Sequence, residues 1–361
     1  MSKIDQAKER LGELFIMGFN GTELADDTSA FISQARIGGI ILFTPNYENP
    51  AQVTTLINQV QECRGGDLPL WITVDHEGGK VQRFKTGFTR LPEADAIAKK
   101  DSPKLLFELS EMVAAELKAV GINVNFAPVA DINSNPKNPV IGNRAYGNDE
   151  DTVSKMVSAF VRGHLHQGVQ PCVKHFPGHG DTTVDSHFAL PKVTDSLDSL
   201  REREFKPFVK AFKSGCRWVM TAHLMNSNLD PDFPATLSKK TLTALLRDEM
   251  RYTGLIISDD LEMKAIADHY GPEEAPRLAI EAGCDLLIYR SEAATRHAYA
   301  CLLKALDEGR LNPERVLDSA DLSMDLKREF LIPYGPLDPK AAAMKTALPA
   351  TAEWLTANFS F

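Results

Sequence analysis

The amino-acid sequence predicts a (β/α)8 TIM barrel, an α/β fold built as a single domain. Eight short apolar runs recur along the 361 residues, and helical patterns separate most of them. Most of the runs are continuous instead of alternating, as expected of parallel strands buried on both faces. An open doubly wound sheet is the alternative, but it would usually need a phosphate-binding glycine turn early in the chain, and none of that form is present.

Each apolar run is assigned to one strand of the barrel. The first run, 14–19, is the weakest, and the others follow at 37–43, 70–75, 122–130, 169–173, 217–221, 254–258 and 284–289. Helix signals lie between them. Asn49 stands as an N-cap before Pro50, and Ser102 opens another helix that Gly121 ends. Further apolar stripes begin at Val153, after Ser238 and at 301–306, and all of them predict core packing.

The expected domain organisation is one barrel domain over 1–332, including a terminal helix over 313–330. Residues 333–361 form a Pro- and Ala-rich tail for which the sequence indicates no role.

Composition excludes several classes of function. Net charge is −9 and no Lys/Arg block stands out, so nucleic-acid binding is not expected. The N-terminus lacks an apolar signal region, and no run of about eighteen apolar residues exists, so no membrane association is expected. The five cysteines are scattered and odd in number, which is typical of reduced thiols in a cytoplasmic protein. A monomer is expected.

The stretch KHFPGHGDTTVDSH, residues 174–187, follows the fifth run and carries three histidines, two aspartates and a lysine. Ionisable groups of this density at a strand end are costly to bury without partners, and such groups gather at functional sites.

Polar residues also follow the neighbouring strands, and in a barrel these strand ends converge on one mouth. They are Asp75, Asp131, Asn133, Arg144, His223, Asp259, Asp260 and Arg290. Carboxylates beside hydrogen-bonding cations suit the hydrolysis of a hydroxyl-rich substrate. Glycoside hydrolysis usually needs one carboxylate at the anomeric carbon and one proton donor at the leaving oxygen.

A metal-dependent barrel hydrolase is the competing interpretation. His175, His179, His187 and His223 could hold zinc together with the aspartates. His175 and His179 are four residues apart, but Pro177 and Gly178 interrupt the helix that would place both on one face.

These residues resemble a known family. KHFPGHGDTTVDSH closely resembles the signature of β-N-acetylglucosaminidases of glycoside hydrolase family 3. VDHEGGKVQRF, GINVNFAPVADIN, IGNRAYG and GLIISDDLEM resemble the other blocks of that family in the same order, so the resemblance runs from about Ile37 to Arg290. The chain is similar to the single-domain cytoplasmic enzymes of Gram-negative cell-wall recycling.

The resemblance implies roles for individual residues. Asp259 matches the catalytic nucleophile, His187 the general acid/base, and Asp185 its dyad partner. The positions that match sugar-binding residues are Asp75, Arg83, Arg144, Lys174 and His175. No metal and no organic cofactor are implied.

The implied reaction is removal of a terminal non-reducing N-acetylglucosamine with retention, through a covalent glycosyl-enzyme. The implied substrates are N-acetylglucosaminyl-1,6-anhydro-N-acetylmuramyl peptides. Other activities of the family, a β-glucosidase or a glycoside phosphorylase, remain alternatives, and so does a non-catalytic sugar-binding protein. His76, Lys80 and Tyr146 stand where Gln, Arg and Phe are common in the family, which leaves the aglycone preference open.

Physical arguments agree with two of these roles. Asp259 ends a strand and is therefore held rigidly, whereas His187 lies in a glycine-rich loop that can move over the substrate. Adjacent residues on a strand point to opposite faces, so only one of Asp259 and Asp260 is expected to face the substrate. His179 and Asp181 are expected to brace the loop.

Overall fold

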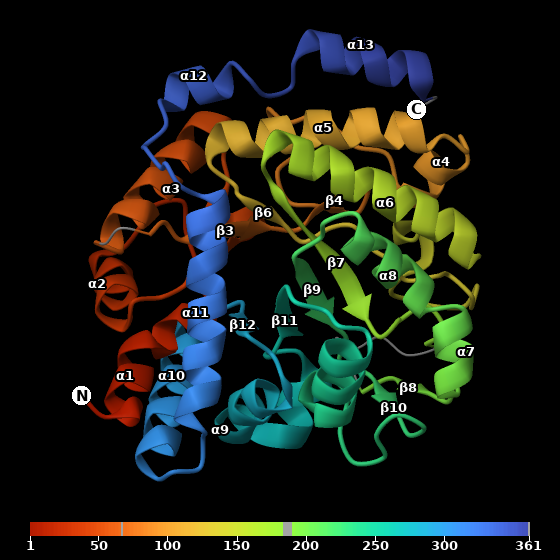
Figure 1. The fold of residues 1–361 in the computed structure, drawn as a ribbon. Helices are drawn as coiled ribbons and strands as arrows, with labels where there is room; N and C mark the ends of the chain where they lie inside the picture. The colour runs from red at the N-terminus through yellow and green to blue at the C-terminus, as the bar shows by residue number, and fades with distance from the viewer. Residues whose placement is uncertain (66–67, 183–189, 360–361) are drawn as a thin grey trace.

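The computed structural model describes residues 1–65, 68–182 and 190–359, and its centre is a closed barrel of eight parallel strands (Figure 1). The strands are β1 (Phe15–Met17), β2 (Gly39–Leu42), β3 (Trp71–Val74), β6 (Val124–Asn125), β7 (Gln170–Phe176), β9 (Trp218–Thr221), β11 (Leu255–Asp260) and β12 (Leu286–Tyr289). Every predicted run overlaps one of these strands, so the predicted barrel is confirmed. The run 122–130 forms only two residues of regular strand and one further bridge, between Val129 and Lys174.

Each barrel strand pairs with its neighbours in the sequence, and β1 pairs with β12 to close the barrel. The closing register places Phe15 opposite Leu287. The β11–β12 pairing is irregular between Ile257 and Asp260, at the C-terminal end of β11. This irregularity lies beside the candidate nucleophile.

Helices surround the barrel, and two of them begin directly after the predicted N-caps Asn49 and Ser102. The outer helices are α2 (Asp26–Ala35), α3 (Pro50–Cys63), α5 (Pro103–Val120), α6 (Glu150–Gln167), α8 (Phe205–Lys213), α9 (Lys264–Ala282), α10 (Glu292–Asp307) and the π-helical η5 (Lys240–Glu249). Asn49 Oδ1 accepts a hydrogen bond from Gln52 N at 2.9 Å and caps α3. Gly121 ends α5 at φ 101°, in the left-handed conformation that favours glycine.

Shorter elements fill the loops and the N-terminus. They are α1 (Lys3–Arg10), η1 (Leu11–Leu14), η2 (Thr44–Asn46), β4 (His76–Gly78), β5 (Val81–Gln82), α4 (Ala94–Ala98), η3 (Gly142–Arg144), β8 (Lys192–Val193), α7 (Leu197–Glu202), β10 (Met225–Asn226) and η4 (Ala235–Leu237). The pairs β4–β5 and β8–β10 form two small sheets outside the barrel. The β4–β5 pair follows β3 and shapes one side of the barrel mouth.

The barrel interior is a packed core. Trp71 and Trp218 meet edge to face inside it, with ring centroids 4.9 Å apart. The helix α11 (Pro313–Phe330) closes the N-terminal end, where Ser323 Oγ accepts a hydrogen bond from Trp71 Nε1 at 3.0 Å. Lys327 is buried there and its Nζ donates to the carbonyl of Gly38 at 2.7 Å. Among the residues that the structure describes, α11 therefore covers the N-terminal end of the barrel.

The residues after Pro333 fold onto the outside of the barrel. The helices α12 (Pro339–Ala343) and α13 (Pro349–Asn358) lie along the side of α3 and α5 (Figure 1). Asn58 exchanges two hydrogen bonds with the backbone of Leu337, at 2.8 and 3.1 Å. Glu116 on α5 accepts from Ala347 N at 2.8 Å, and Leu355 is buried. The tail is thus packed against the barrel helices.

No helix in the described part of the chain has both the length and the apolar character needed to cross a membrane.

Candidate active site

A cavity of about 610 Å³ opens at the C-terminal end of the barrel. Every expected site residue that the structure describes lines it: Asp75, Arg83, Arg144, Lys174, His175 and Asp259. Apolar side chains, among them Phe43, Phe126 and Met220, complete the wall. This combination of apolar surface and a few convergent polar groups is typical of a small-molecule site.

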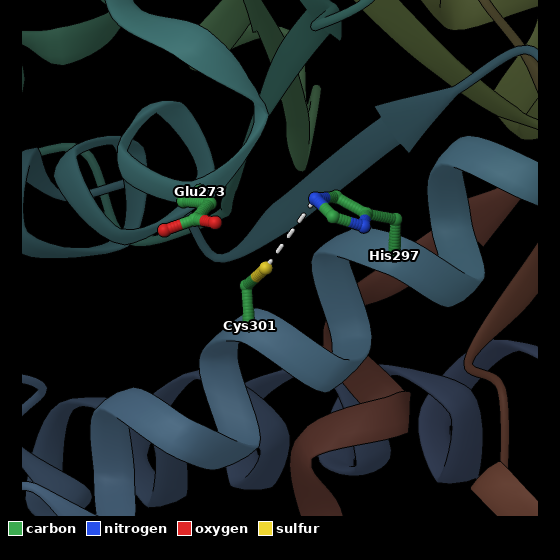
Figure 2. Close-up of side chains that lie close together, drawn as sticks. All are labelled: Glu273, His297 and Cys301. Carbon is green, nitrogen blue, oxygen red and sulfur yellow. Dashed lines mark hydrogen bonds between the residues drawn. The ribbon is translucent and has the colours of Figure 1, made fainter.

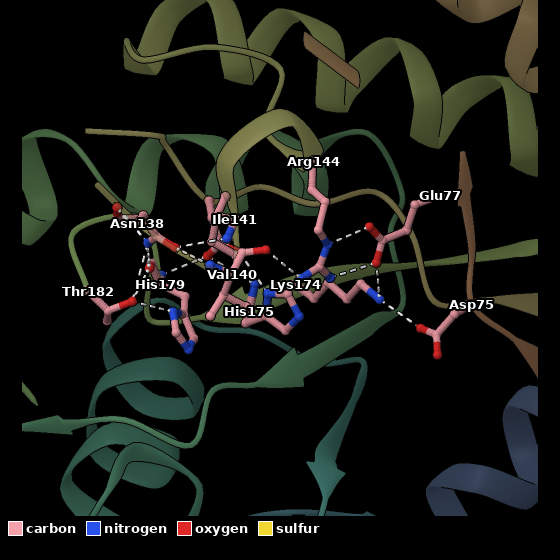
Figure 3. A network of polar contacts seen from close by, with 12 residues as sticks. Asp75, Glu77, Asn138, Val140, Ile141, Arg144, Lys174, His175, His179 and Thr182 are labelled. Atoms are coloured by element: carbon pink, nitrogen blue, oxygen red, sulfur yellow. Dashed lines mark hydrogen bonds and ion pairs between the residues drawn. The ribbon is translucent and has the colours of Figure 1, made fainter. Parts of the chain in front are cut away.

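Five charged side chains form one network on the β3 and β7 side of the cavity, and Figure 3 shows four of them, Asp75, Glu77, Arg144 and Lys174. Lys174 Nζ lies 2.8 Å from Asp75 Oδ1 and 2.6 Å from Glu77 Oε1. Arg144 donates to both carboxylate oxygens of Glu77, from Nε and Nη2, at 2.8 Å each. Arg83 Nη2 donates to Asp75 Oδ2 at 3.2 Å. Three cations therefore share two carboxylates.

Burial and the neighbouring charges shift the pKa values of these groups in opposite directions. Burial alone would raise the pKa of Asp75, but Lys174 and Arg83 outweigh it and hold the pKa below its usual range. The pKa of Glu77 is lowered to about 2, because Arg144 and Lys174 likewise outweigh its burial. Burial would lower the pKa of Lys174, but the same two carboxylates raise it above its usual value. The network is therefore fully ionised at neutral pH and presents fixed donors and acceptors to a polar ligand.

Glu77 is the member of this network that sequence reasoning missed. It follows Asp75 by two residues on β4, and its side chain is 7% exposed. The available signal was alternation, since residues two apart in an extended segment point to the same side.

Asp131 organises a second cluster. Its carboxylate is fully buried and lies 2.7 Å from His175 Nδ1. It also accepts from the backbone N–H groups of His175 and His179, at 3.2 and 2.7 Å. Burial opposes ionisation, but the two histidines more than offset it and lower the pKa of Asp131. A carboxylate at His175 Nδ1 fixes that ring, which leaves Nε2 directed away from the pair.

Asn138 connects the loop of Arg144 to the start of the segment that follows β7 (Figure 3). Its Oδ1 accepts from the backbone N–H groups of Val140 and Ile141, at 2.9 and 2.8 Å. Its Nδ2 donates to the carbonyls of His179 and Gly180, at 2.8 and 2.9 Å. His179, expected to brace this loop, also contacts Thr182 Oγ1 through Nδ1 at 2.8 Å, and burial lowers its pKa to about 4.

Asp259 and Asp260 end β11, and both line the cavity. The strand is irregular at this point, and the carboxylate of Asp260 accepts from backbone N–H groups, so the expectation that only one of the two faces a substrate stays a prediction. Burial would raise the pKa of Asp259, but His223 and His175 outweigh it and lower the pKa. For Asp260, burial dominates and raises the pKa to about 7. Asp259 is therefore the more acidic of the two neighbours and stays ionised at neutral pH, whereas Asp260 titrates near pH 7.

Asp260 and His223 support the strand end. Asp260 Oδ1 accepts from the backbone N–H groups of Glu262 and Arg290, at 3.0 and 3.4 Å. His223 is buried, with Nδ1 2.8 Å from Thr236 Oγ1 and Nε2 3.0 Å from the carbonyl oxygen of Asp260.

Asp185 and His187, the expected acid/base dyad, lie outside the described residues, in the segment 183–189. The described chain stops at Thr182 and resumes at Leu190.

Comparison with known proteins identifies the family to which this chain belongs. The model of the glycosyl hydrolase family 3 N terminal domain matches residues 6–322. "Beta-hexosaminidase" of Methylococcus capsulatus is 38% identical over 298 residues, which cover 81% of this chain and 86% of that protein. "Beta-hexosaminidase A" of Pseudoalteromonas piscicida is 36% identical over 335 residues, which cover 86% of this chain and 56% of that protein.

The solved structure of a glycoside hydrolase family 3 beta-N-acetylglucosaminidase from Paenibacillus sp. superposes with a TM-score of 0.88 at 40% identity. The superposition covers 91% of this chain and 63% of that one. The chain thus spans little more than half the length of some relatives and most of the length of others.

Proposed function

Because this chain belongs to glycosyl hydrolase family 3, we propose that it is a retaining exo-β-N-acetylglucosaminidase. It removes a terminal non-reducing N-acetylglucosamine, and its physiological substrates are N-acetylglucosaminyl-1,6-anhydro-N-acetylmuramyl peptides of peptidoglycan recycling. The observation that carries the proposal is the ionised Asp259 at the end of β11, in a cavity lined by a charged, donor-rich network.

Asp259 is the nucleophile of the proposed reaction. Its lowered pKa keeps the carboxylate ionised, so it can attack the anomeric carbon and form the glycosyl-enzyme. His187, oriented by Asp185, protonates the leaving oxygen and then removes a proton from the attacking water. Their roles rest on the resemblance of residues 174–187 to the family signature.

The charged network binds the sugar. Lys174, Arg83 and Arg144 donate hydrogen bonds to hydroxyls and to the acetamido carbonyl, and Asp75 accepts from hydroxyls. His175, held by Asp131, presents its second ring nitrogen to the same sugar. Ion pairing fixes these side chains before a substrate arrives, which lowers the entropic cost of binding.

Substrate class is tested with nitrophenyl β-glycosides of N-acetylglucosamine, glucose and N-acetylgalactosamine. The expected result is preference for N-acetylglucosamine, unchanged by EDTA and without acceleration by inorganic phosphate. Preference for glucose would overturn the substrate assignment, phosphate-dependent turnover would indicate a phosphorylase, and loss of activity with EDTA would indicate a metal-dependent hydrolase.

The nucleophile is tested by substitution. Asp259→Ala should abolish turnover, whereas Asp260→Asn should retain a measurable rate because its carboxylate supports the backbone of Glu262 and Arg290. Trapping with a fluorinated, slowly hydrolysed glycoside should label a peptide containing Asp259. Turnover by Asp259→Ala, or a label on another residue, would contradict the assignment.

A further inference from the structure

A second group of reactive side chains lies on the outer helices and is not part of the cavity lining. His297 and Cys301 project from the same face of α10, and Glu273 of α9 lies opposite them (Figure 2). Glu273 and His297 are exposed, and Cys301 is half-buried. The three side chains have no role in the proposed hydrolysis.

The spacing of these residues suits a bound ion. His297 and Cys301 are four apart on a helix, so their side chains are neighbours on its surface. Cys301 Sγ lies 3.6 Å from His297 Nε2. A tetrahedral zinc ion holds a thiolate at about 2.3 Å and a ring nitrogen at about 2.0–2.1 Å, which places the two ligand atoms about 3.6 Å apart.

Glu273 adds a carboxylate oxygen to the imidazole nitrogen of His297 and the sulfur of Cys301. One ligand atom from each of Glu273, His297 and Cys301 lies within 4.8 Å of the other two. Glu273 is exposed, so its side chain can change rotamer toward the other two ligand atoms. Sulfur, imidazole nitrogen and carboxylate oxygen together are the donors that zinc takes, whereas Mg²⁺ and Ca²⁺ prefer oxygen alone.

Competing interactions at the cluster are few. Across the described ranges, the one hydrogen bond made by these three side chains is the contact between Cys301 and His297. The adjacent Glu274 is different, because Arg277 and Arg310 already engage it. Lys304 and Arg310 are the nearby cations; burial and Glu273 raise the pKa of Cys301, and these two cations oppose that rise. Metal binding would release the thiol proton, so affinity should increase with pH.

We propose that Glu273, His297 and Cys301 form a binding site for Zn²⁺, with water as the fourth ligand. The ion joins α9 to α10 at a point two residues after Gly271, where α9 is interrupted by a non-helical residue. Because the ion binds the folded chain in preference to the unfolded one, it stabilises the native state.

The proposal is tested on the full chain, prepared without a histidine tag and freed of metal by chelation. Calorimetric titration with Zn²⁺ should show one site, with Tm rising as Zn²⁺ is added. Titration with Co²⁺ should produce a thiolate-to-metal charge-transfer band. Both signals should be lost in Cys301→Ser and His297→Ala, and Glu273→Gln should weaken the affinity at least about tenfold, as loss of one ligand of three predicts.

Matched controls use the same residue types elsewhere. Cys63→Ser and His166→Ala change a half-buried cysteine and an exposed histidine outside the cluster, and both should bind Zn²⁺ as the wild type does. Equal Zn²⁺ affinity in the wild type, Cys301→Ser and His297→Ala would overturn the proposal, as would the absence of a charge-transfer band. Hydrolysis by Cys301→Ser should match the wild type, so this proposal and the proposed glycosidase activity fail independently.

Discussion

At the scale of single residues, Glu77 holds the cation network of the cavity together. It is nearly buried and pairs with both Arg144 and Lys174. Neutralising it would remove the carboxylate partner of Arg144 and leave Lys174 to share Asp75 with Arg83, which is a charge excess in a poorly solvated site.

Glu77→Gln should therefore destabilise the protein by about 3–5 kcal/mol, as is usual when one partner of a buried ion pair is removed. The value of kcat/KM on a nitrophenyl N-acetylglucosaminide should fall together with stability. Urea unfolding and steady-state kinetics measure the two effects. Glu249→Gln, which breaks an exposed pair with Arg201, is the control and should cost less than about 1 kcal/mol. Equal costs for the two variants would contradict the role of Glu77.

Asp260 gives a pH-dependent prediction. Its pKa in the folded state is about 7, mainly because of burial, and the unfolded value is about 3.9. Between these values the folded chain binds more protons at this position than the unfolded chain. The stability from this group is therefore greatest below about pH 4 and is lost as pH rises to about 7.

Asp260→Asn removes that dependence. The difference in unfolding free energy between Asp260→Asn and the wild type should rise from pH 4 to pH 7 in favour of the variant. Urea unfolding at several pH values measures it. Asp268→Asn makes the same chemical change at an exposed position and should show no such trend. A flat difference for Asp260→Asn would mean that its carboxyl titrates normally.

At the scale of elements, the segment after β7 depends on a close approach of two backbones. A Cβ added at Gly180 would lie 1.6 Å from the carbonyl oxygen of Ile132, a contact that no rotamer can relieve. Only glycine allows this approach, which places the backbone of His179 against Asp131.

Gly180→Ala should displace this segment and lower kcat/KM by up to about 100-fold, the scale on which a 1 Å misplacement acts in catalysis. Gly335→Ala is the matched control, since a Cβ there meets nothing within 4 Å. Hydrolysis rates for both variants, beside their Tm values, test the prediction. Wild-type kinetics in Gly180→Ala would show that the segment tolerates the shift.

Some helices and strands follow from the sequence pattern alone, and others do not. Continuous apolar runs and caps such as Asn49 and Ser102 depend on local chemistry, so the strands and helix starts follow from the pattern. The π-helical η5 and the small β4–β5 sheet depend on tertiary packing, and the pattern does not predict them. The interruption of α9 at Gly271 has a local cause, because Pro272 follows the glycine directly.

In the candidate site, too, some residues could be predicted from the sequence, whereas their contacts with distant residues could not. Asp75, Arg144, Lys174 and Asp259 could be predicted because the barrel brings all strand ends to one mouth. The bonds of Asp131 to His175 and His179 join positions more than forty residues apart, and no local signal encodes such partners. The same applies to Asn138, whose amide links two loops.

At the scale of the whole molecule, the tail contributes to the stability of the barrel. Leu355 of α13 is buried and belongs to the main hydrophobic core. Leu355→Ala should lower the free energy of unfolding by about 2–5 kcal/mol, the usual cost of such a truncation in a core, and should leave kcat/KM unchanged. Leu348→Ala, at an exposed leucine of the same segment, should stay within about 0.5 kcal/mol. Equal stabilities, measured by urea unfolding, would show that α13 packs only loosely.

Closure of the barrel through β1 and β12 has a consequence during synthesis. Phe15 pairs with Leu287, near the other end of the barrel sequence. A ribosome adding about 5–20 residues per second needs roughly 15–55 s to deliver the second residue after the first. Throughout that interval the nascent β1 has no partner on one edge, and such an edge attracts other unpaired strands. The nascent chain therefore passes through a stage in which a chaperone would protect the unpaired edge of β1. The closed barrel has no such edge and needs no such protection.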